Sequence, residues 1–467
     1  MGTRYGDDGA GASHLYLKRT KMKQSSKIVI AILVVTGLGV AAYFALLKRN
    51  SGPEIPSLSL RGGSANASTE FLNAQKAVEY YRDEIRKHPE TVKNYLELAQ
   101  LYLQEARVTG RHREYMPKAR YLIDETLNRD PQNFDARMIK GTMLMTMHHF
   151  GEARELAEDA VKQNPHSAIG YGVLCDALVE SGRYEEAVKT CDQMLSVRPD
   201  LRSYARASYL RELHGDNPGA VDAMKMAADA GVYGQENRAW ALYNLGKLFL
   251  NQGNLDTAAY IFKGILEERP DYAYAMSGLA QVRRAKGETQ GAVDLVTKAY
   301  QQTPEHVFVE QLADIYRATG QTQSADGVAK IVLQAFEQHE KDGWNINREY
   351  AMFCANHGMN LKEALDRAKN EFDLRPDNID VLETYAWTLY KNGKGAEAVP
   401  YIEKAMRLRT RSFTLHYHAG AIYAAAGIKD SADAYFARAK NENRFVNVFC
   451  PDVNQQVKNS PGIAGNQ

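Results

Sequence analysis

One short stretch of the sequence collects the side chains that soft metal ions prefer. Residues 142–153, TMLMTMHHFGEA, contain three methionines and two histidines, all between residues 143 and 149. Thioether sulfur and imidazole nitrogen suit copper-type ions, so this Met/His stretch is a candidate metal site. On a helix, however, Met143 and Met145 would point about 200° apart and would not converge on one ion. We therefore favour a helix that ends in a turn, and we predict no metal site.

The other residues show no constellation that would carry catalysis. The sequence contains no GxxxxGKS/T phosphate-binding loop, no HExxH pattern and no GxSxG nucleophile motif. Its four cysteines include no CxxC pair, which argues against a zinc ribbon or a thioredoxin-type site. Cys175 and Cys191, which fall in one expected hairpin, are interpreted as buried small residues rather than as a disulfide. We predict no catalytic residues and no cofactor, and hence a protein that is not an enzyme.

The net charge of +1 combines a basic N-terminal segment with a mildly acidic remainder. Residues 1–50 contain eight Lys or Arg and two Asp, which leaves 50 Lys or Arg against 55 Asp or Glu in residues 51–467. Nucleic-acid binding needs a basic surface that displaces counterions from phosphates. The acidic balance of residues 51–467 therefore predicts no nucleic-acid partner.

Residues 28–47, IVIAILVVTGLGVAAYFALL, form an uncharged apolar run that is long enough to cross a bilayer. More Lys and Arg precede this run than follow it, and the basic flank of a membrane helix stays in the cytoplasm. We expect a cytoplasmic segment at residues 1–27, an uncleaved signal-anchor helix at residues 28–47, and the rest of the chain on the trans side. In a bacterium that side is the periplasm. A cleaved signal peptide is the alternative, and the Ser, Gly and Pro of residues 48–70 predict a flexible stalk.

A repeated pattern organises the rest of the chain. Pro131, Pro165 and Pro199 follow one another at intervals of 34 residues, and Pro270 and Pro304 repeat the interval. Within each interval, apolar residues spaced by three and four predict two amphipathic helices. A glycine near position 15 would end the first helix, and the proline near position 32 would stop the second.

The final unit shows the pattern clearly when Phe413 is counted as position 1. Positions 8, 11, 15, 20, 24 and 27 then hold Gly420, Tyr423, Gly427, Ala432, Phe436 and Ala439. This pattern resembles the tetratricopeptide repeat (TPR) superfamily. We expect ten such repeats, beginning near residues 92, 134, 168, 201, 239, 273, 306, 345, 379 and 413. They would form a solenoid over residues 71–446, followed by a cap and tail at residues 447–467.

The resemblance implies an all-α fold, a right-handed superhelical solenoid of about ten helix-turn-helix repeats, with a concave groove. In such repeats the first helix lines the groove, chiefly through positions 2, 5, 9 and 12. Carried over to this sequence, the groove positions are Tyr209, Trp240, Tyr243, Lys247, Tyr274, Gln281, Arg284, Glu310, Asp314, Arg317, Trp387, Tyr390 and Tyr417. Aromatic residues beside Arg and Lys dominate binding hot spots, so we expect the groove to bind a protein or peptide partner.

The whole chain is also similar to bacterial envelope proteins that carry one N-terminal helix and a periplasmic repeat array. The favoured interpretation is a membrane-anchored scaffold or adaptor that supports the assembly of an envelope complex. The alternative is a ligand- or metal-binding envelope protein that uses residues 143–149 or an aromatic pocket in the groove. The sequence leaves open which partner binds and whether the chain forms a homo-oligomer.

Overall fold

Helices account for all the regular structure in residues 55–450, the part of the chain that the computed structural model describes. No strand lies between these residues, so the expected all-α class is confirmed. The expected signal-anchor helix at residues 28–47 and residues 451–467 of the expected tail lie outside the described residues. Among the described helices, none is both long and apolar enough to span a bilayer.

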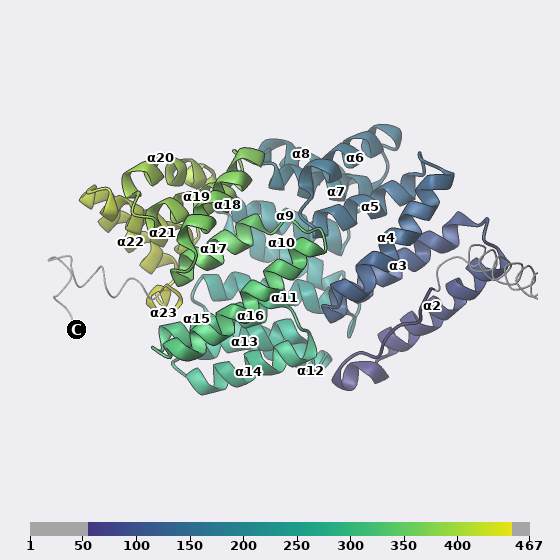
Figure 1. Cartoon of the computed structure of the whole chain (residues 1–467), viewed down its shortest axis with the longest axis horizontal. Coiled ribbons are helices and arrows are strands. Elements are labelled where there is room, and N and C mark those ends of the chain that lie inside the picture. The colour runs from purple at the N-terminus through teal and green to yellow at the C-terminus, as the bar shows by residue number, and fades with distance from the viewer. Residues whose placement is uncertain (1–54, 451–467) are drawn as a thin grey trace, which may run out of the picture. The chain divides into compact units, whose positions relative to one another are not determined.

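Ten helical hairpins follow one another through residues 92–442 (Figure 1). Their first helices are α3 (Val92–Thr109), α5 (Phe134–Thr146), α7 (Ala168–Glu180), α9 (Leu201–Leu213), α11 (Glu236–Asn251), α13 (Ala273–Ala285), α15 (His306–Ala318), α17 (Asn347–His357), α19 (Ile379–Lys391) and α21 (Phe413–Ala425). Their second helices are α4 (His112–Arg129), α6 (Phe150–Gln163), α8 (Tyr184–Val197), α10 (Asn217–Asp229), α12 (Leu255–Glu268), α14 (Thr289–Gln302), α16 (Thr322–Lys341), α18 (Leu361–Leu374), α20 (Gly395–Ala405) and α22 (Lys429–Glu442). The 3₁₀ helix η1 (Gly63–Ala67) and α2 (Thr69–Lys87) precede the hairpins, η2 (Met406–Leu408) extends α20, and α23 (Val446–Phe449) ends the array.

The first helices begin where the repeat pattern of the sequence places them. Eight of the ten start at the expected residue, α11 starts three residues earlier at Glu236, and α17 starts two residues later at Asn347. The delay at α17 has a structural reason, because the backbone N–H of Asn345 donates a hydrogen bond to Met147 O (3.0 Å) instead of entering the helix.

The two helices of a hairpin approach closely where the pattern places small residues. The ring of Phe262 on α12 is fully buried and lies against Gly246 of α11 and Gly278 of α13. A Cβ atom at Gly246 would lie 2.4 Å from Phe262 Cε1, and one at Gly278 would lie 2.5 Å from Phe262 Cζ. These distances leave no room for a methyl group. The Phe262 ring can therefore pack here only because both positions are glycine.

Successive turns of the array touch one another at a regular set of contacts, which we call junctions. At each junction, a polar residue in the segment that follows one hairpin binds the C-terminal carbonyls of the first helix of the hairpin five earlier. Thr410 Oγ1 donates to Leu213 O, Asn378 Nδ2 donates to Glu180 O (3.1 Å), and Asn443 Nδ2 donates to Leu250 O (3.1 Å). The last carbonyls of a helix have no partner within the helix, so these bonds satisfy groups that would otherwise need water.

The junctions bring hairpins that are distant in sequence into contact. The bonds of Asn378, Thr410 and Asn443 span between 192 and 199 residues. In Figure 1 the helices α17 to α19 accordingly lie beside α7 to α9. The array therefore completes one turn in about six hairpins, and its second turn rests on the first.

Residues 58–70 differ from the expected flexible stalk. Leu58 and Arg61 are 6% and 4% exposed. Arg61 Nη1 forms an ion pair with Glu70 Oε2 (2.8 Å), and Arg61 Nε donates to Glu105 Oε2 (3.1 Å). The Ser, Gly and Pro content of this segment suggested flexibility. Composition cannot reveal that Arg61 has a carboxylate partner 44 residues away. The stalk prediction is therefore wrong for residues 58–70.

Candidate functional site

The Met/His stretch forms the junction between α5 and the loop before α17. Met143 and Met147 are each 2% exposed, so their sulfur atoms lie in the packing rather than at an open site. His148 Nδ1 lies 2.9 Å from Asn345 O, and His149 Nε2 lies 2.7 Å from Gly343 O. Both imidazoles are thus used to bind backbone carbonyls of the second turn. No group of three or more His, Cys, Asp or Glu in residues 55–450 is placed to hold a metal ion.

His148 occupies the turn position that glycine holds in most repeats. Its φ is 62°, in the left-handed region where Gly182 (φ 74°) lies in the next hairpin. A side chain in this region costs about 1–2 kcal/mol, so the contact of His148 with Asn345 must offset strain. The junction thus explains why histidine rather than glycine occupies this turn.

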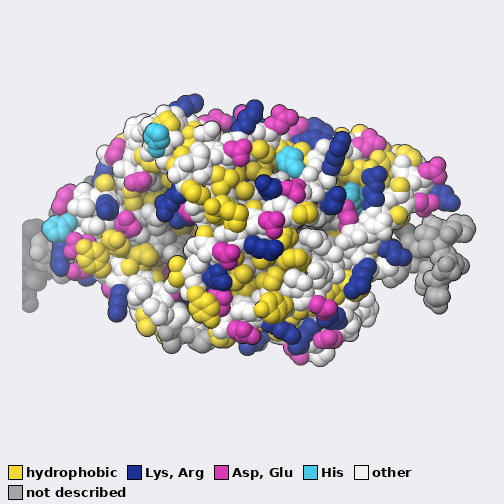
Figure 2. Space-filling view, turned by 180° about the vertical axis from the view of Figure 1, so that it is seen from behind, with side chains coloured by type: hydrophobic (Ala, Val, Ile, Leu, Met, Phe, Trp, Pro, Cys, Tyr) yellow, Lys and Arg dark blue, Asp and Glu magenta, His cyan; other side chains and the backbone are white. Residues whose placement is uncertain are grey.

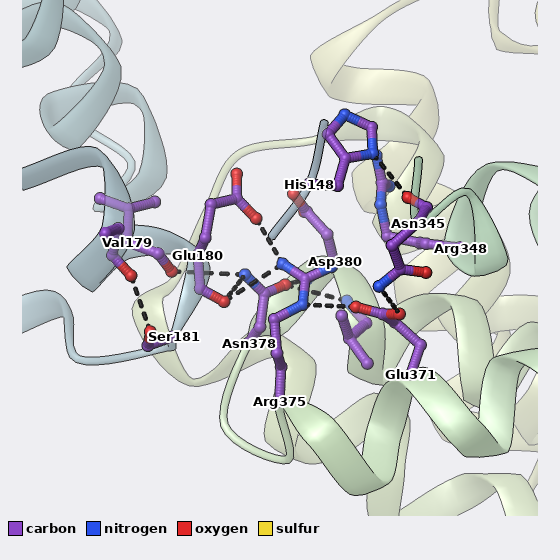
Figure 3. A network of polar contacts seen from close by, with 12 residues as sticks. His148, Val179, Glu180, Ser181, Asn345, Arg348, Glu371, Arg375, Asn378 and Asp380 are labelled. Carbon is purple, nitrogen blue, oxygen red and sulfur yellow. Dashed lines mark hydrogen bonds and ion pairs between the residues drawn. The ribbon is translucent and has the colours of Figure 1, made fainter. Parts of the chain in front are cut away.

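The neighbouring junction is held by a buried network of polar side chains (Figure 3). Arg375 is 9% exposed and pairs with Glu371 (Nε to Oε1, 2.6 Å) and with Glu180 (Nη1 to Oε2, 2.5 Å). Asn345 Nδ2 donates to the other oxygen of Glu371 (2.9 Å). Burial raises the pKa of the Glu180 carboxyl above its ordinary value, although Arg375 opposes the shift. Arg375 therefore ties α7 to α18 and stabilises the buried carboxylate of Glu371 and the partly exposed carboxylate of Glu180.

A hollow of about 870 Å³ opens along the first helices of five consecutive hairpins. Residues of α3, α5, α7, α9 and α11 form its wall, and we call it the α3–α11 hollow. A second hollow of about 660 Å³ adjoins it and shares Arg107, Arg198, Arg202 and Arg206 with it. Volumes of about 300–1,000 Å³ are typical of clefts that bind ligands.

Three of the sequence-predicted groove residues line the α3–α11 hollow. Tyr209 of α9 is 40% exposed, and Trp240 of α11 is 36% exposed. Lys247 follows Trp240 by about two turns of α11. Its Nζ lies 5.7 Å from the ring centre of Tyr243. The phenol hydroxyl of Tyr209 can donate a hydrogen bond to a bound segment.

Three of the four arginines along the wall are bound to carboxylates of the chain. Arg206 pairs with Asp176 through Nε and Nη2 (2.8 and 2.5 Å). Arg198 pairs with Asp200 (3.3 Å), and Arg107 pairs with Glu236 (2.8 Å). Arg202 is the exception, because no ion pair joins its exposed guanidinium to any carboxylate in the described part of the chain.

Comparison with known proteins agrees with this architecture. Sequence models of the tetratricopeptide repeat match residues 144–211, 204–273 and 243–307. Residues 144–307 are tetratricopeptide repeats. Protein KINESIN LIGHT CHAIN-RELATED 3 of Arabidopsis thaliana is 26% identical over 177 residues, which cover 36% of this chain and only 23% of that protein.

Solved structures are also similar to parts of the chain. A thermophilic TPR protein of Thermus thermophilus is 22% identical, with a TM-score of 0.36, and the match covers 41% of this chain and 98% of that one. Human IFIT1 is 14% identical, with a TM-score of 0.41, and the match covers 80% of this chain and 88% of its own.

The predicted groove residues of the later hairpins lie in contacts within the chain. Arg284 is 8% exposed, its Nη2 donates to Val448 O (3.0 Å) in α23, and its guanidinium lies 5.6 Å from the ring centre of Phe449. Asp314 accepts from His357 Nε2 (3.2 Å), whose Nδ1 accepts from Arg317 Nε (3.0 Å). The remaining members of this group are also in contact with neighbours, namely Gln281 with Arg284, Glu310 with His306, and Tyr274 with Glu305 and Tyr243.

Trp387 and Tyr417 lie inside the packing and present almost no surface to a groove. They are 2% and 3% exposed. The Trp387 ring stacks on His418 (3.9 Å between centroids) and Tyr390 (4.8 Å), and its Nε1 donates to Asn356 Oδ1 (2.8 Å). These two side chains pack inside because a large aromatic ring gains most when its apolar area is fully buried, and the space between adjacent hairpins buries it most completely.

Sequence reasoning missed the arginines of the hollow. Arg202 holds position 2 of its TPR, so the position rule that selected Trp240 would also have found it. Arg107 and Arg198 had no such signal, because one lies near the end of a helix and the other in the loop before α9.

Proposed function

We propose that the TPR array is a non-enzymatic scaffold that binds a segment of a partner protein in the α3–α11 hollow. The observation that carries this proposal is the pair of exposed aromatic side chains, Tyr209 and Trp240, on one wall of a hollow of about 870 Å³. Rigid aromatics bury a large area at a small loss of conformational entropy, and they are enriched where binding energy concentrates. Their place on adjacent first helices gives a partner two anchors on one continuous surface.

The scaffold is anchored to a membrane by residues 28–47 and holds the array on the trans side, where it supports assembly of an envelope complex. This part of the proposal is supported by the sequence alone, through the uncharged run and the excess of Lys and Arg before it. In a bacterium the array would lie in the periplasm.

Chemical cross-linking of the full-length protein in its native membrane, followed by mass spectrometry, tests the binding surface. A variant with Tyr209→Ala and Trp240→Ala should lose the captured partner. The matched control replaces Tyr233 and Tyr260, which are 71% and 80% exposed but do not line the hollow, and it should keep the partner. Equal capture by both variants would exclude the hollow, and capture of only further copies of the chain would instead indicate a self-assembling scaffold.

Protease treatment tests the membrane placement independently of the partner. If the proposal is correct, the array in intact cells or spheroplasts is cleaved by protease added outside the inner membrane. Cleavage only after that membrane is opened would place the array on the cytoplasmic side and contradict the orientation. Release of the full-length protein by alkaline carbonate would contradict the anchor.

A further inference from the structure

We propose that the α3–α11 hollow takes an acidic segment of the partner protein. Carboxylates of that segment lie against Arg202 and Lys247, and its apolar side chains lie against Trp240 and Tyr209. This inference rests on the proposed function and adds the chemical class of the segment that binds.

The charges along the wall of the hollow are unequal. Its lining contains five cations (Arg107, Arg198, Arg202, Arg206 and Lys247) and three carboxylates (Asp176, Asp200 and Glu212), a difference of +2. The lining of the adjoining hollow contains the same four arginines and a single carboxylate, Asp200, a difference of +3. This local excess contrasts with the net charge of +1 for all 467 residues. A complementary partner segment is therefore negatively charged.

The cations that could receive a partner's carboxylates are the ones without an ion pair. Arg107, Arg198 and Arg206 are already bound to carboxylates of the chain. Arg202 and Lys247 are both exposed, and neither forms an ion pair with a carboxylate in residues 55–450. They belong to α9 and α11, the helices that also carry Tyr209 and Trp240. Charge and aromatic surface thus come from the same two TPR hairpins.

The far end of the hollow disfavours further negative charge. A smaller hollow of about 320 Å³ shares Tyr209, Glu212 and Lys247 with it, and adds Asp380 and Glu383 against Arg411. Burial raises the pKa of the Glu212 carboxyl, although Lys247 and Asn251 oppose the shift. The acidic part of the bound segment therefore extends from Arg202 to Lys247, and it ends before Asp380.

The ends of the chain itself do not match this charge. Residues 1–50 carry eight Lys or Arg against two Asp, so they are repelled by a basic hollow, and residues 451–467 contain one Lys and one Asp. A nucleic acid is also negative, but it needs a broad basic surface that displaces the counterions of its phosphates. On the face shown in Figure 2, Lys and Arg side chains alternate with Asp and Glu rather than forming a broad basic surface. An acidic protein segment fits these observations best.

The test uses full-length protein in detergent micelles and fluorescence anisotropy of a fluorescein-labelled peptide made of Glu with one central Phe. Two matched peptides carry Gln or Lys in place of Glu, and a labelled oligothymidylate serves as a nucleic-acid probe. We expect the Glu peptide to bind at least about tenfold more tightly than the Gln peptide, and its affinity to fall as salt is added. Tighter binding of the Lys peptide or of the oligothymidylate, equal affinities, or binding of none of the probes would overturn the proposal.

Charge reversal at the two unpaired cations makes the test specific to the site. The variant Arg202→Glu with Lys247→Glu should lose at least about tenfold in affinity for the Glu peptide and gain affinity for the Lys peptide. The control reverses Lys189 on α8 and Lys298 on α14, which are exposed and do not line the hollow, and it should change neither affinity by more than about twofold. Equal effects of the two variants would reject the assignment of these residues.

The same variants separate this inference from the proposed function. If cross-linking loses the natural partner in the Tyr209→Ala and Trp240→Ala variant but keeps it in the charge-reversed variant, the hollow binds a partner whose acidity is irrelevant. If both variants keep the partner, the hollow itself is not the binding surface. Circular dichroism and thermal unfolding of each variant establish that the array remains folded.

Discussion

Replacing Asn378 by alanine measures what a junction contributes to the fold. Asn378 is 2% exposed and has two roles. Its Oδ1 accepts from the backbone N–H groups of Asp380 and Val381 (2.9 and 3.0 Å) and caps α19. Its Nδ2 donates to the carbonyls of Val179 and Glu180 (3.3 and 3.1 Å) at the end of α7, across the junction.

The expected magnitude follows from these contacts. Loss of a helix N-cap costs about 1 kcal/mol. Loss of two buried hydrogen bonds costs about 1 kcal/mol each, so Asn378→Ala should cost about 3 kcal/mol in total. Asn133→Ala is a matched control, because Asn133 caps α5 (to Ala136 N, 3.0 Å) and its Nδ2 binds only the nearby Asp130. The control should cost about 1 kcal/mol.

Hydrogen exchange is the appropriate assay, because long repeat arrays do not unfold in a single step. The difference of about 2 kcal/mol corresponds to about a 30-fold change in the local opening equilibrium. Asn378→Ala should therefore speed exchange of the amides in the last turn of α7 and the first turn of α19. This increase should be about 30-fold larger than the increase that Asn133→Ala causes in the first turn of α5. If α7 keeps its protection in Asn378→Ala, the two turns of the array are not coupled through this contact, and the reasoning on junctions fails.

Three further outcomes are expected. Gly246→Ala should destabilise the array by about 1–3 kcal/mol because its methyl group would meet Phe262. Gly264→Ala should stabilise α12 by about 0.5–1 kcal/mol because its methyl group would point into open space. Urea unfolding distinguishes the signs of the two changes. Copper(I) titration should give the same result for the parent and for a variant of the Met/His stretch that combines Met143→Leu, Met145→Leu and His148→Ala, and binding lost only in the variant would restore the metal hypothesis. Burial raises the pKa of the Glu70 carboxyl, but Arg269 and Arg61 outweigh it and hold the pKa below its ordinary value. Stability from Glu70 is thus complete above the ordinary carboxyl pKa of about 4.3 and is lost as the pH falls through the lowered value, so Glu70→Gln should flatten the acid side of a stability profile measured by urea unfolding.

The hairpins could be predicted from the sequence because the signals that define them are local. Apolar residues three and four apart mark each helix, and a small residue such as Gly246 marks the close approach to Phe262 sixteen positions later. Every one of these relations lies within a single repeat. Eight first helices consequently begin at the residue expected from spacing alone.

The junctions could not be predicted, because their partners are almost 200 residues apart. His148 was a candidate metal ligand in a turn, and residue 345 was the expected start of a first helix, until the structure placed His148 Nδ1 2.9 Å from Asn345 O. Nothing in the local pattern states how many hairpins complete one turn of the array, since small rotations between neighbours add up over six repeats. The packing of residues 58–70 was missed for the same reason, since Glu105, the partner of Arg61, lies on another element.

The return of the array on itself also explains why the groove rule succeeded for some positions and not for others. The rule treats each first helix as one side of an open groove, which holds for α9 and α11, where Tyr209 and Trp240 remain exposed. The same positions of later hairpins face other parts of the chain, and Arg284 is bound by α23 through Val448 O. The open part of the groove therefore lies along the hairpins from α3 to α11. The proposed binding site accordingly includes Arg202, which lines the hollow, and leaves out Trp387, which is 2% exposed where Trp240 is 36% exposed.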